Sequence, residues 1–147
     1  MSQAMRAFYD EMVVQGVGDK VTQFTMADFS RTFNPAGTGS GVVGSDHAWG
    51  NHMLVVGGGL TGADFYGNAG ANGTPFPQLT FNTADDSDNG SGARGRWVPR
   101  TSVEEYTATL ARWFGVPSAS MSSVFPKIGN FAQGVNTDLG FMQPPAP

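Results

Sequence analysis

The sequence predicts an α/β fold, in which helices flank a small sheet and long glycine-rich loops join the elements. Three observations support this prediction. Two segments have helical apolar spacing, two short apolar or β-branched segments lie between them, and glycine accounts for 21 of the 147 residues. A chain of this length is expected to form a single domain, residues 1–147, with a buried core.

The first predicted helix lies near the start of the chain. Its apolar residues follow the spacing i, i+3, i+4, i+7 and i+8 that places side chains on one helical face. They are Met5, Phe8, Tyr9, Met12 and Val13. Ser2 is a candidate N-cap, and Gly16 is the expected end of the helix.

The central part of the chain predicts two strands and two long loops. The segment VTQFTM, residues 21–26, is β-branched and aromatic, which favours a strand. Residues 27–33 are expected to form one helical turn, and residues 34–52 a loop. The apolar run MLVVGGGL, residues 53–60, is typical of a strand buried on both faces. Residues 61–96 are rich in Gly, Asn, Asp and Pro and predict one long irregular segment.

The clearest predicted helix spans residues 103–114. Ser102 and Glu105 form the capping-box pattern at its start, and Gly115 ends it. Its apolar face consists of Val103, Tyr106, Leu110, Ala111, Trp113 and Phe114. We expect Trp113 or Phe114 to be buried against the sheet. Further apolar anchors follow in the tail, at Val124, Phe125, Ile128, Phe131, Leu139 and Phe141.

Composition narrows the classes of function. Charged residues make up only 14% of the chain and the net charge is −4 without a basic run, so nucleic acid is not an expected partner. No apolar stretch approaches the length of a membrane span. The first residues contain no apolar segment of a signal peptide. Cysteine is absent, which rules out disulfides and thiolate chemistry.

The segment GSDHAWGNH, residues 44–52, contains both histidines of the chain. His47 and His52 are five residues apart, so on a helix they would point about 140° apart and could not share a ligand face. In a loop between two strands, Asp46, His47 and His52 can converge, and imidazole and carboxylate are the ordinary ligands of zinc and similar ions. The alternative is that these polar side chains only hold a glycine-rich loop in place.

Asp28 and Arg31 form a second candidate group, just past the end of the first predicted strand. Asp28 is a candidate metal ligand, and equally a candidate N-cap of a short turn. Arg31 could pair with Asp28 or receive an anionic substrate through its planar guanidinium.

The segment DDSDNG, residues 85–90, places oxygen-bearing residues like the first half of a calcium-binding loop. The twelfth position of such a loop requires a bidentate glutamate, but Arg96 stands there. A solvated loop is therefore the preferred interpretation.

Several segments together resemble a known family. They are VTQFTMADFSRTFNPAGTGSGVVGSDHAWGNHMLVVGGGLTGADFYG, GRWVPRTSVEEYTATLARWFGV, VFPKIGNF and DLGFM. This ordered set resembles the C-terminal portion of domain of unknown function 1501, a bacterial family, commonly exported, that is grouped with the alkaline-phosphatase-like and sulfatase-like superfamily. The resemblance implies a periplasmic or extracellular protein and part of a mostly parallel, alkaline-phosphatase-like sheet flanked by helices.

The resemblance also implies one or two divalent metal ions held by Asp and His at strand ends, with zinc, manganese or calcium as the expected metal. His52 precedes a predicted strand and matches the later histidine of the superfamily. The first strand is followed by Asp28-Phe29, which departs from the superfamily's Asp-His pair, whereas Asp46-His47 supplies such a pair from within the loop. Either aspartate can be the counterpart, so Asp28, Asp46, His47 and His52 are all candidate ligands.

The superfamily's nucleophile and remaining ligands are expected in an N-terminal half that these 147 residues do not include. The chain is therefore expected to be a truncated product or fragment, not catalytically complete by itself. Two classes of function follow. One is the metal-site-bearing part of a phosphoric or sulfuric ester hydrolase acting on an anionic ester. The other is a non-catalytic binding or self-assembly module, whose partner is a second copy or an N-terminal partner chain.

Overall fold

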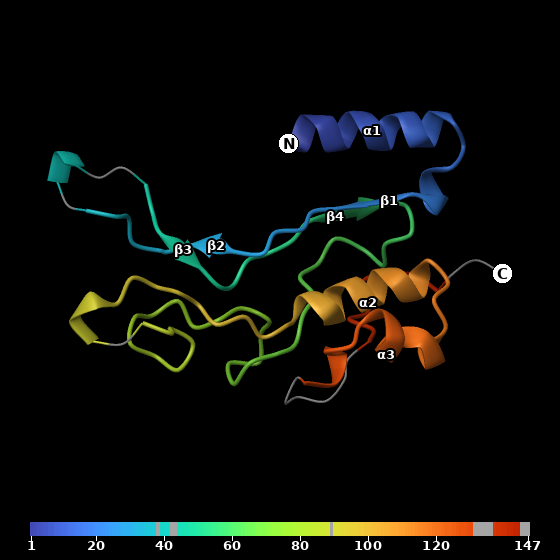
Figure 1. Ribbon diagram of the computed structural model, residues 1–147. Helices are drawn as coiled ribbons and strands as arrows, with labels where there is room; N and C mark the ends of the chain where they lie inside the picture. Colours follow the sequence, from blue (N-terminus) through green and yellow to red (C-terminus); the bar gives the residue numbers. More distant parts are fainter. Residues whose placement is uncertain (38, 42–43, 89, 131–136, 145–147) are drawn as a thin grey trace. The chain divides into compact units, whose positions relative to one another are not determined.

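The computed structural model describes residues 1–37, 39–41, 44–88, 90–130 and 137–144. Within them lie the helices α1 (Ser2–Val14), α2 (Val103–Trp113) and α3 (Met121–Val124), and the strands β1 (Thr22–Phe24), β2 (Ser30–Arg31), β3 (His47–Ala48) and β4 (Val55–Gly57) (Figure 1). Short 3-10 turns occur at Gly18–Lys20, Gly39–Gly41, Gly90–Gly92, Ser118–Ser120 and Ile128–Asn130. The predicted α/β class is thus confirmed at the level of mixed helices and strands. In this described part, no helix has the length and apolar character needed to cross a membrane.

The chain divides into two compact units. Unit 1 comprises Met1–Thr25, Leu54–Gly67 and Thr101–Pro147, and unit 2 comprises Met26–Met53 and Asn68–Arg100. Each unit contains one two-stranded sheet, β1 with β4 in unit 1 and β2 with β3 in unit 2. All the candidate site residues named from the sequence fall in unit 2.

Both strand pairs are antiparallel, so the mostly parallel sheet implied by the family resemblance is not seen among the described residues. Phe24 is paired with Val55 in unit 1, and Arg31 with His47 in unit 2. Parallel neighbours need a long crossover connection, usually a helix. The described residues between β1 and β4 contain no α-helix that could serve as one. An alkaline-phosphatase-like sheet is therefore not confirmed.

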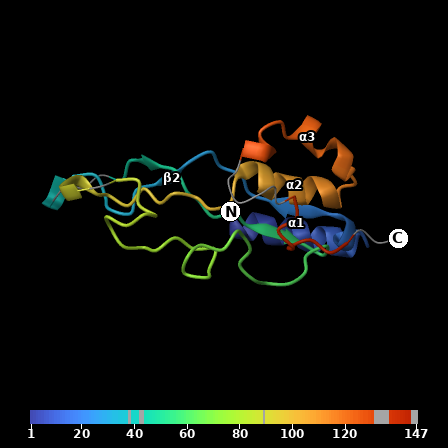
Figure 2. The same ribbon diagram turned by 90° about the horizontal axis from the view of Figure 1, so that it is seen from below.

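The first predicted helix is confirmed as α1. Its N-cap is Met1, so the expected cap by Ser2 is wrong, and no side chain caps the helix start. Gly16 follows the helix with φ +73° and donates its N–H to the Val13 carbonyl at 3.0 Å, as expected for a helix end. In unit 1, β1 and β4 lie between α1 and α2 (Figures 1 and 2). None of the residues of α1 is buried, and Phe8 keeps 44% of its surface exposed.

The second predicted helix, α2, begins with the predicted capping box. The Ser102 hydroxyl accepts a hydrogen bond from the Glu105 N–H at 3.0 Å, and the Glu105 carboxylate accepts one from the Ser102 N–H at 2.9 Å. Ala108 of α2 forms a buried cluster with Met121 of α3 and Ile128. The Tyr106 ring lies 5.8 Å from the ring of Phe141, which is also buried. The core of unit 1 is thus made by α2, α3 and the tail, while the predicted anchor Phe131 lies outside the described residues.

The predicted burial of the last turn of α2 is only partly correct. Trp113 is half-buried, and its indole lies where a Cβ on Gly59 would approach to 3.0 Å. Phe114 is 85% exposed. The buried side of α2 includes Glu105 and Thr109, and their polar groups are hydrogen-bonded. Phe114 does not lie on this buried side of the helix.

Two further expectations for the central segments need correction. Residues 27–33 do not form a helical turn, because Ser30 and Arg31 lie in β2. The predicted strand over 53–60 is shorter, and its central residues Val55–Gly57 are half-buried instead of buried on both faces. Both errors come from local composition, which does not specify the partner strand.

Candidate functional site

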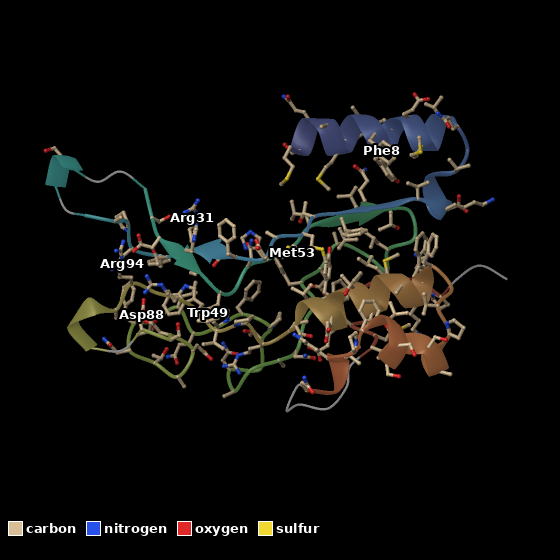
Figure 3. The ribbon with its side chains drawn as sticks, in the orientation of Figure 1. Phe8, Arg31, Trp49, Met53, Asp88 and Arg94 are labelled. Atoms are coloured by element: carbon tan, nitrogen blue, oxygen red, sulfur yellow. The ribbon has the colours of Figure 1, made fainter. Side chains whose placement is uncertain are left out.

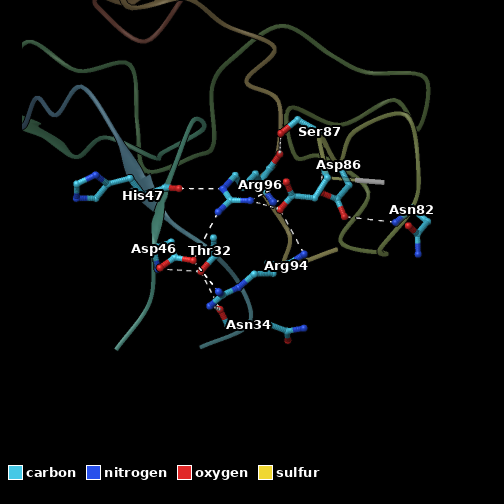
Figure 4. A network of polar contacts seen from close by, with 10 residues as sticks. Thr32, Asn34, Asp46, His47, Asn82, Asp86, Ser87, Arg94 and Arg96 are labelled. Atoms are coloured by element: carbon cyan, nitrogen blue, oxygen red, sulfur yellow. Dashed lines mark hydrogen bonds and ion pairs between the residues drawn. The ribbon is translucent and has the colours of Figure 1, made fainter. Parts of the chain in front are cut away.

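Asp46 belongs to a group of charged side chains in unit 2 (Figure 4). Its Oδ2 atom lies 2.6 Å from Nη1 of Arg94 and 3.6 Å from Nη2 of Arg96. Arg96 in turn donates through Nη1 to both oxygens of Asp88, at 2.7 and 2.6 Å. We call the four residues Asp46, Asp88, Arg94 and Arg96 the arginine clasp.

The clasp connects the 88–96 segment to strand β3. Arg96 donates through Nε to the His47 carbonyl oxygen at 3.1 Å, and the Arg94 side chain reaches the Asn34 carbonyl at 3.4 Å. The hydrogen bond to Asp88 is the main cause of a raised pKa for the Arg96 guanidinium, to which the negative charge of Asp46 adds. Because the arginine side chains keep about a quarter of their surface exposed, each single ion pair contributes little to the stability of the fold. The clasp matters because its ion pairs share residues and form one network.

The segment that resembles a calcium loop uses its carboxylates for internal contacts. Asp86 is 3% exposed and accepts backbone N–H bonds from Asn82, Asp88 and Arg96, at 3.3, 3.0 and 3.2 Å. Asp85 pairs with Arg100 and accepts the Gln78 N–H at 2.8 Å. These carboxylates bond to groups of the chain itself and are largely buried, so the segment is a loop but not the solvated loop that was predicted.

His47 lies on the other face of the β2–β3 pair. Successive residues of a strand point to opposite faces, so the Asp46 and His47 side chains diverge, as Figure 4 shows. The centroid of the Phe29 ring lies 4.5 Å from that of the His47 ring and 5.4 Å from the Arg31 guanidinium carbon. Arg31 and Arg94 accordingly lie on opposite sides of the strand pair (Figure 3).

Arg31 differs from the other arginines of the chain. Each of the others pairs with an aspartate, whereas no carboxylate within the described residues pairs with Arg31. Its Nη1 donates to the Ser45 carbonyl oxygen at 3.2 Å, which orders the side chain. The alternative pairing of Arg31 with Asp28 is therefore not observed, and the Arg31 side chain is exposed.

The remaining candidates, Asp28 and His52, are both exposed. The backbone N–H of His52 donates to Oδ1 of Asn51 at 2.9 Å, and Asn51 donates to the Phe29 carbonyl at 3.1 Å. Across the described residues, no three or more His, Asp or Glu side chains are grouped closely enough to hold a metal ion. The structure therefore does not bring the four predicted ligands together as one group.

The clasp arginines and Asp88 were not identified as site residues from the sequence. A signal for them was present, because three aspartates at 85, 86 and 88 are followed by three arginines at 94, 96 and 100 in a chain of low charge. Such a block of opposite charges predicts internal pairing. The partner of Arg94, however, is distant in sequence and could not be identified from this block.

Comparison with known proteins yields one family. A model of the family described as "Protein of unknown function (DUF1501)" matches residues 1–84. The match includes every predicted site residue, and the similar segments after residue 84 lie outside it. No curated protein and no solved structure shows a significant match.

Proposed function

We propose a function from one premise: the chain belongs to the DUF1501 family of proteins of unknown function. On this premise the chain is the metal-site-bearing part of a hydrolase of the alkaline-phosphatase-like and sulfatase-like kind, acting outside the cytoplasm, and it is not catalytically complete by itself. Its substrate is an anionic phosphoric or sulfuric ester.

One observation carries this proposal. The candidate ligands Asp28, Asp46, His47 and His52 all lie in unit 2, in or near the strands β2 and β3, but they are not gathered into one group of ligands among the described residues. Residues of the types that bind metals are present, but they are not gathered around one point. This is what we expect of an incomplete metal site. Zinc, manganese or calcium bound there would polarise the ester oxygen and stabilise the developing charge.

Arg31 has the role of substrate binding in this proposal. Its guanidinium is exposed and ordered by Ser45 and Phe29, and no aspartate neutralises it among the described residues. A planar guanidinium binds phosphate and sulfate oxygens through two parallel N–H bonds. We propose that Arg31 orients the ester group, while His47, on the paired position of β3, lies on the same face.

Metal uptake tests the proposed ligands. Purified wild-type chain should bind zinc or manganese weakly, and the double variant His47→Ala/His52→Ala should lose this binding. Asp64→Asn, which removes an exposed carboxylate in unit 1, is the matched control and should bind as wild type. Equal metal content in the double-histidine variant and the wild type would show that the loop is not a metal site.

Activity tests the proposed incompleteness. The chain alone should not hydrolyse chromogenic aryl phosphates or sulfates in the presence of zinc, manganese or calcium, because the proposed site residues include no nucleophile to attack the ester. Turnover that disappears in the His52→Ala variant would show instead that the chain contains a complete site.

A second function, that of a non-catalytic binding or self-assembly module, is favoured by a different observation. Several large apolar side chains of unit 1 are well exposed, among them Val14 at 81%, Phe114 at 85% and Phe24 at 48%. Two-stranded sheets also leave edges at which another chain can pair. Self-association measured by light scattering, together with absence of metal uptake, would favour this function, and a strictly monomeric mass would count against it.

A further inference from the structure

Phe29 and Arg31 lie on one face of the β2–β3 pair. Residues two positions apart in an extended strand point to the same face. The guanidinium carbon of Arg31 accordingly lies 5.4 Å from the centroid of the Phe29 ring, within the range of a cation–π contact. The Nη1 atom of Arg31 also donates a hydrogen bond to the Ser45 carbonyl oxygen at 3.2 Å. The charge of Arg31 is therefore held in an ordered position beside an aromatic ring.

His47 joins these two residues from the neighbouring strand. It is paired with Arg31, and next to this pair the Thr32 N–H donates to the Asp46 carbonyl oxygen at 3.0 Å. Hydrogen-bonded and non-hydrogen-bonded pairs alternate in an antiparallel ladder, so Arg31 and His47 form a non-hydrogen-bonded pair, the kind in which side chains lie closer. The His47 ring is also tilted by 49° against the Phe29 ring. We call Phe29, Arg31 and His47 the aromatic–arginine face.

The aromatic–arginine face is accessible and positively charged. Phe29 keeps 39% of its surface exposed, and the Arg31 and His47 side chains are exposed as well. Among the described residues no carboxylate forms an ion pair with Arg31, and the Asp46 side chain, which pairs with Arg94, points away from His47 (Figure 4). A planar cation thus lies beside a partly exposed ring, which is complementary to a ligand that joins an anionic group to a flat apolar one.

We propose that the aromatic–arginine face binds an aromatic anion, in which Arg31 holds a phosphate or sulfate group and Phe29 packs against the aromatic ring that carries it. The inference rests on the proposed function, because it takes Arg31 as the residue that binds the anionic ester. It adds that the alcohol part of this ester is aromatic. His47 contacts Phe29 from the other strand and supports the position of its ring. Two aromatic rings attract each other in offset or edge-to-face contact, with centroids about 4.5 to 7 Å apart.

The first experiment compares ligands on the wild-type chain. NMR titrations with phenyl, cyclohexyl and methyl phosphate are made in the presence of a chelator, so that no metal ion contributes. Phenyl phosphate should bind about fivefold more tightly than methyl phosphate, equivalent to about 1 kcal/mol. Cyclohexyl phosphate carries a ring of similar size that is neither flat nor aromatic, and its affinity should be closer to that of methyl phosphate. Phenyl and methyl sulfate repeat the comparison and distinguish the two oxyanions.

Phe29→Leu tests the contact with the aromatic ring. This variant keeps an apolar side chain but removes the ring, so the preference for phenyl over methyl phosphate should disappear. Phe114→Leu is the matched control, because it removes an exposed phenyl ring from unit 1, and it should keep the preference. If Phe29→Leu fails to fold, the comparison of the three phosphates on the wild type still decides.

Arg31→Gln tests the contact with the anionic group. It should abolish binding of phenyl and methyl phosphate alike, since it removes the charge that both ligands share. Arg31→Lys keeps the charge but loses the planar fork of N–H groups, and it should bind both phosphates more weakly than the wild type. Arg112→Gln is the matched control, because it removes a half-exposed arginine of unit 1, and it should bind as the wild type.

The outcomes separate this inference from the proposed function. If phenyl phosphate binds no more tightly than methyl or cyclohexyl phosphate, while Arg31→Gln abolishes binding, the aromatic specificity is wrong and the substrate-binding role of Arg31 stands. If the wild type binds none of these anions, or if Arg31→Gln binds them equally well, this inference and that role both fail. A preference for phenyl phosphate that disappears in Phe29→Leu supports the inference, whatever the outcome of the metal-uptake test.

Discussion

Unit 1 and unit 2 are stabilised by different kinds of contact. Among the described residues, unit 1 holds nearly all the buried hydrophobic side chains: Tyr106, Ala108, Leu110, Met121, Ile128, Phe141 and Met142. In unit 2 the buried hydrophobic residue is Ala48, beside the buried polar residues Thr32 and Asp86. Unit 1 therefore has an apolar core, whereas unit 2 depends on a polar network and on partly exposed aromatic rings.

The aromatic rings of unit 2 surround a glycine. Phe33, Phe81 and Trp97 form a group with ring centroids 5.9 to 6.1 Å apart. Gly95 has φ +74°, and a Cβ there would lie 2.7 Å from the Phe33 side chain. Phe33 is nevertheless 62% exposed, while Phe81 and Trp97 are half-buried, so no ring of this group is fully buried. The comparison teaches that a chain can confine most of its hydrophobic burial to one unit and hold the other together through ion pairs and buried polar groups.

The largest expected effect belongs to the apolar core of unit 1. Met121→Ala should lower the free energy of unfolding by about 2 to 5 kcal/mol, because it leaves a cavity beside Ala108 and Ile128. Val124→Ala in the same helix is the control and should change stability little, since Val124 is 49% exposed. Thermal or urea unfolding followed by circular dichroism measures both. Similar losses in the two variants would show that unit 1 lacks the core described.

In unit 2, the largest loss of stability is expected from removal of a buried carboxylate. Asp86→Ala leaves three backbone N–H groups without their acceptor and should cost about 2 to 3 kcal/mol. Hydrogen exchange at the amides of Asp88 and Arg96 measures the local effect. Asp64→Ala, at an exposed aspartate, is the control. Unchanged protection in Asp86→Ala would mean that polar contacts do not hold this unit together.

The pH dependence of unit 1 follows from Tyr106. Burial raises the pKa of Tyr106 to about 12 from its ordinary value of 10.0, so the folded state favours the neutral phenol. The stabilisation is complete below pH 10 and is lost as the pH rises to 12, by up to about 2 kcal/mol. Tyr106→Phe should remove this alkaline loss, at a cost of about 1 kcal/mol for the hydrogen bond to the Thr25 carbonyl. Urea unfolding at pH 9 and pH 11 compares the wild type with Tyr106→Phe. An equal loss of stability at pH 11 in both proteins would mean that a group other than Tyr106 causes it.

The smallest effect is expected at the end of α2. Phe114→Ala should change the free energy of unfolding by no more than about 0.5 kcal/mol, because the side chain is 85% exposed. Trp113→Ala should cost more, since the indole lies against Gly59. The melting temperatures of Phe114→Ala and Trp113→Ala show which variant loses more stability. A larger loss for Phe114→Ala would mean that this ring is covered in solution.

Much of the local structure was predictable from the sequence. The capping box of Ser102 and Glu105, the helix over residues 103–113 and the helix end at Gly16 all appear as expected. The residues that could bear chemistry were also identifiable by type, because His47 and His52 are the only histidines. The arrangement of these residues in space was not predictable. Whether side chains in a loop come together depends on the course of the backbone and not on their spacing in the sequence.

The sequence by itself determined what depends on residues within about one helical turn of one another. Helix caps, helical periodicity and glycine at positive φ are of this kind, because the interacting groups are close along the chain. The tertiary structure decided strand direction, the exposure of Phe114 and the partners of Asp46. The hydrogen bond from Arg96 to His47, for example, joins residues 49 positions apart. Such a contact depends on which distant segments meet, and local patterns carry no information about that choice.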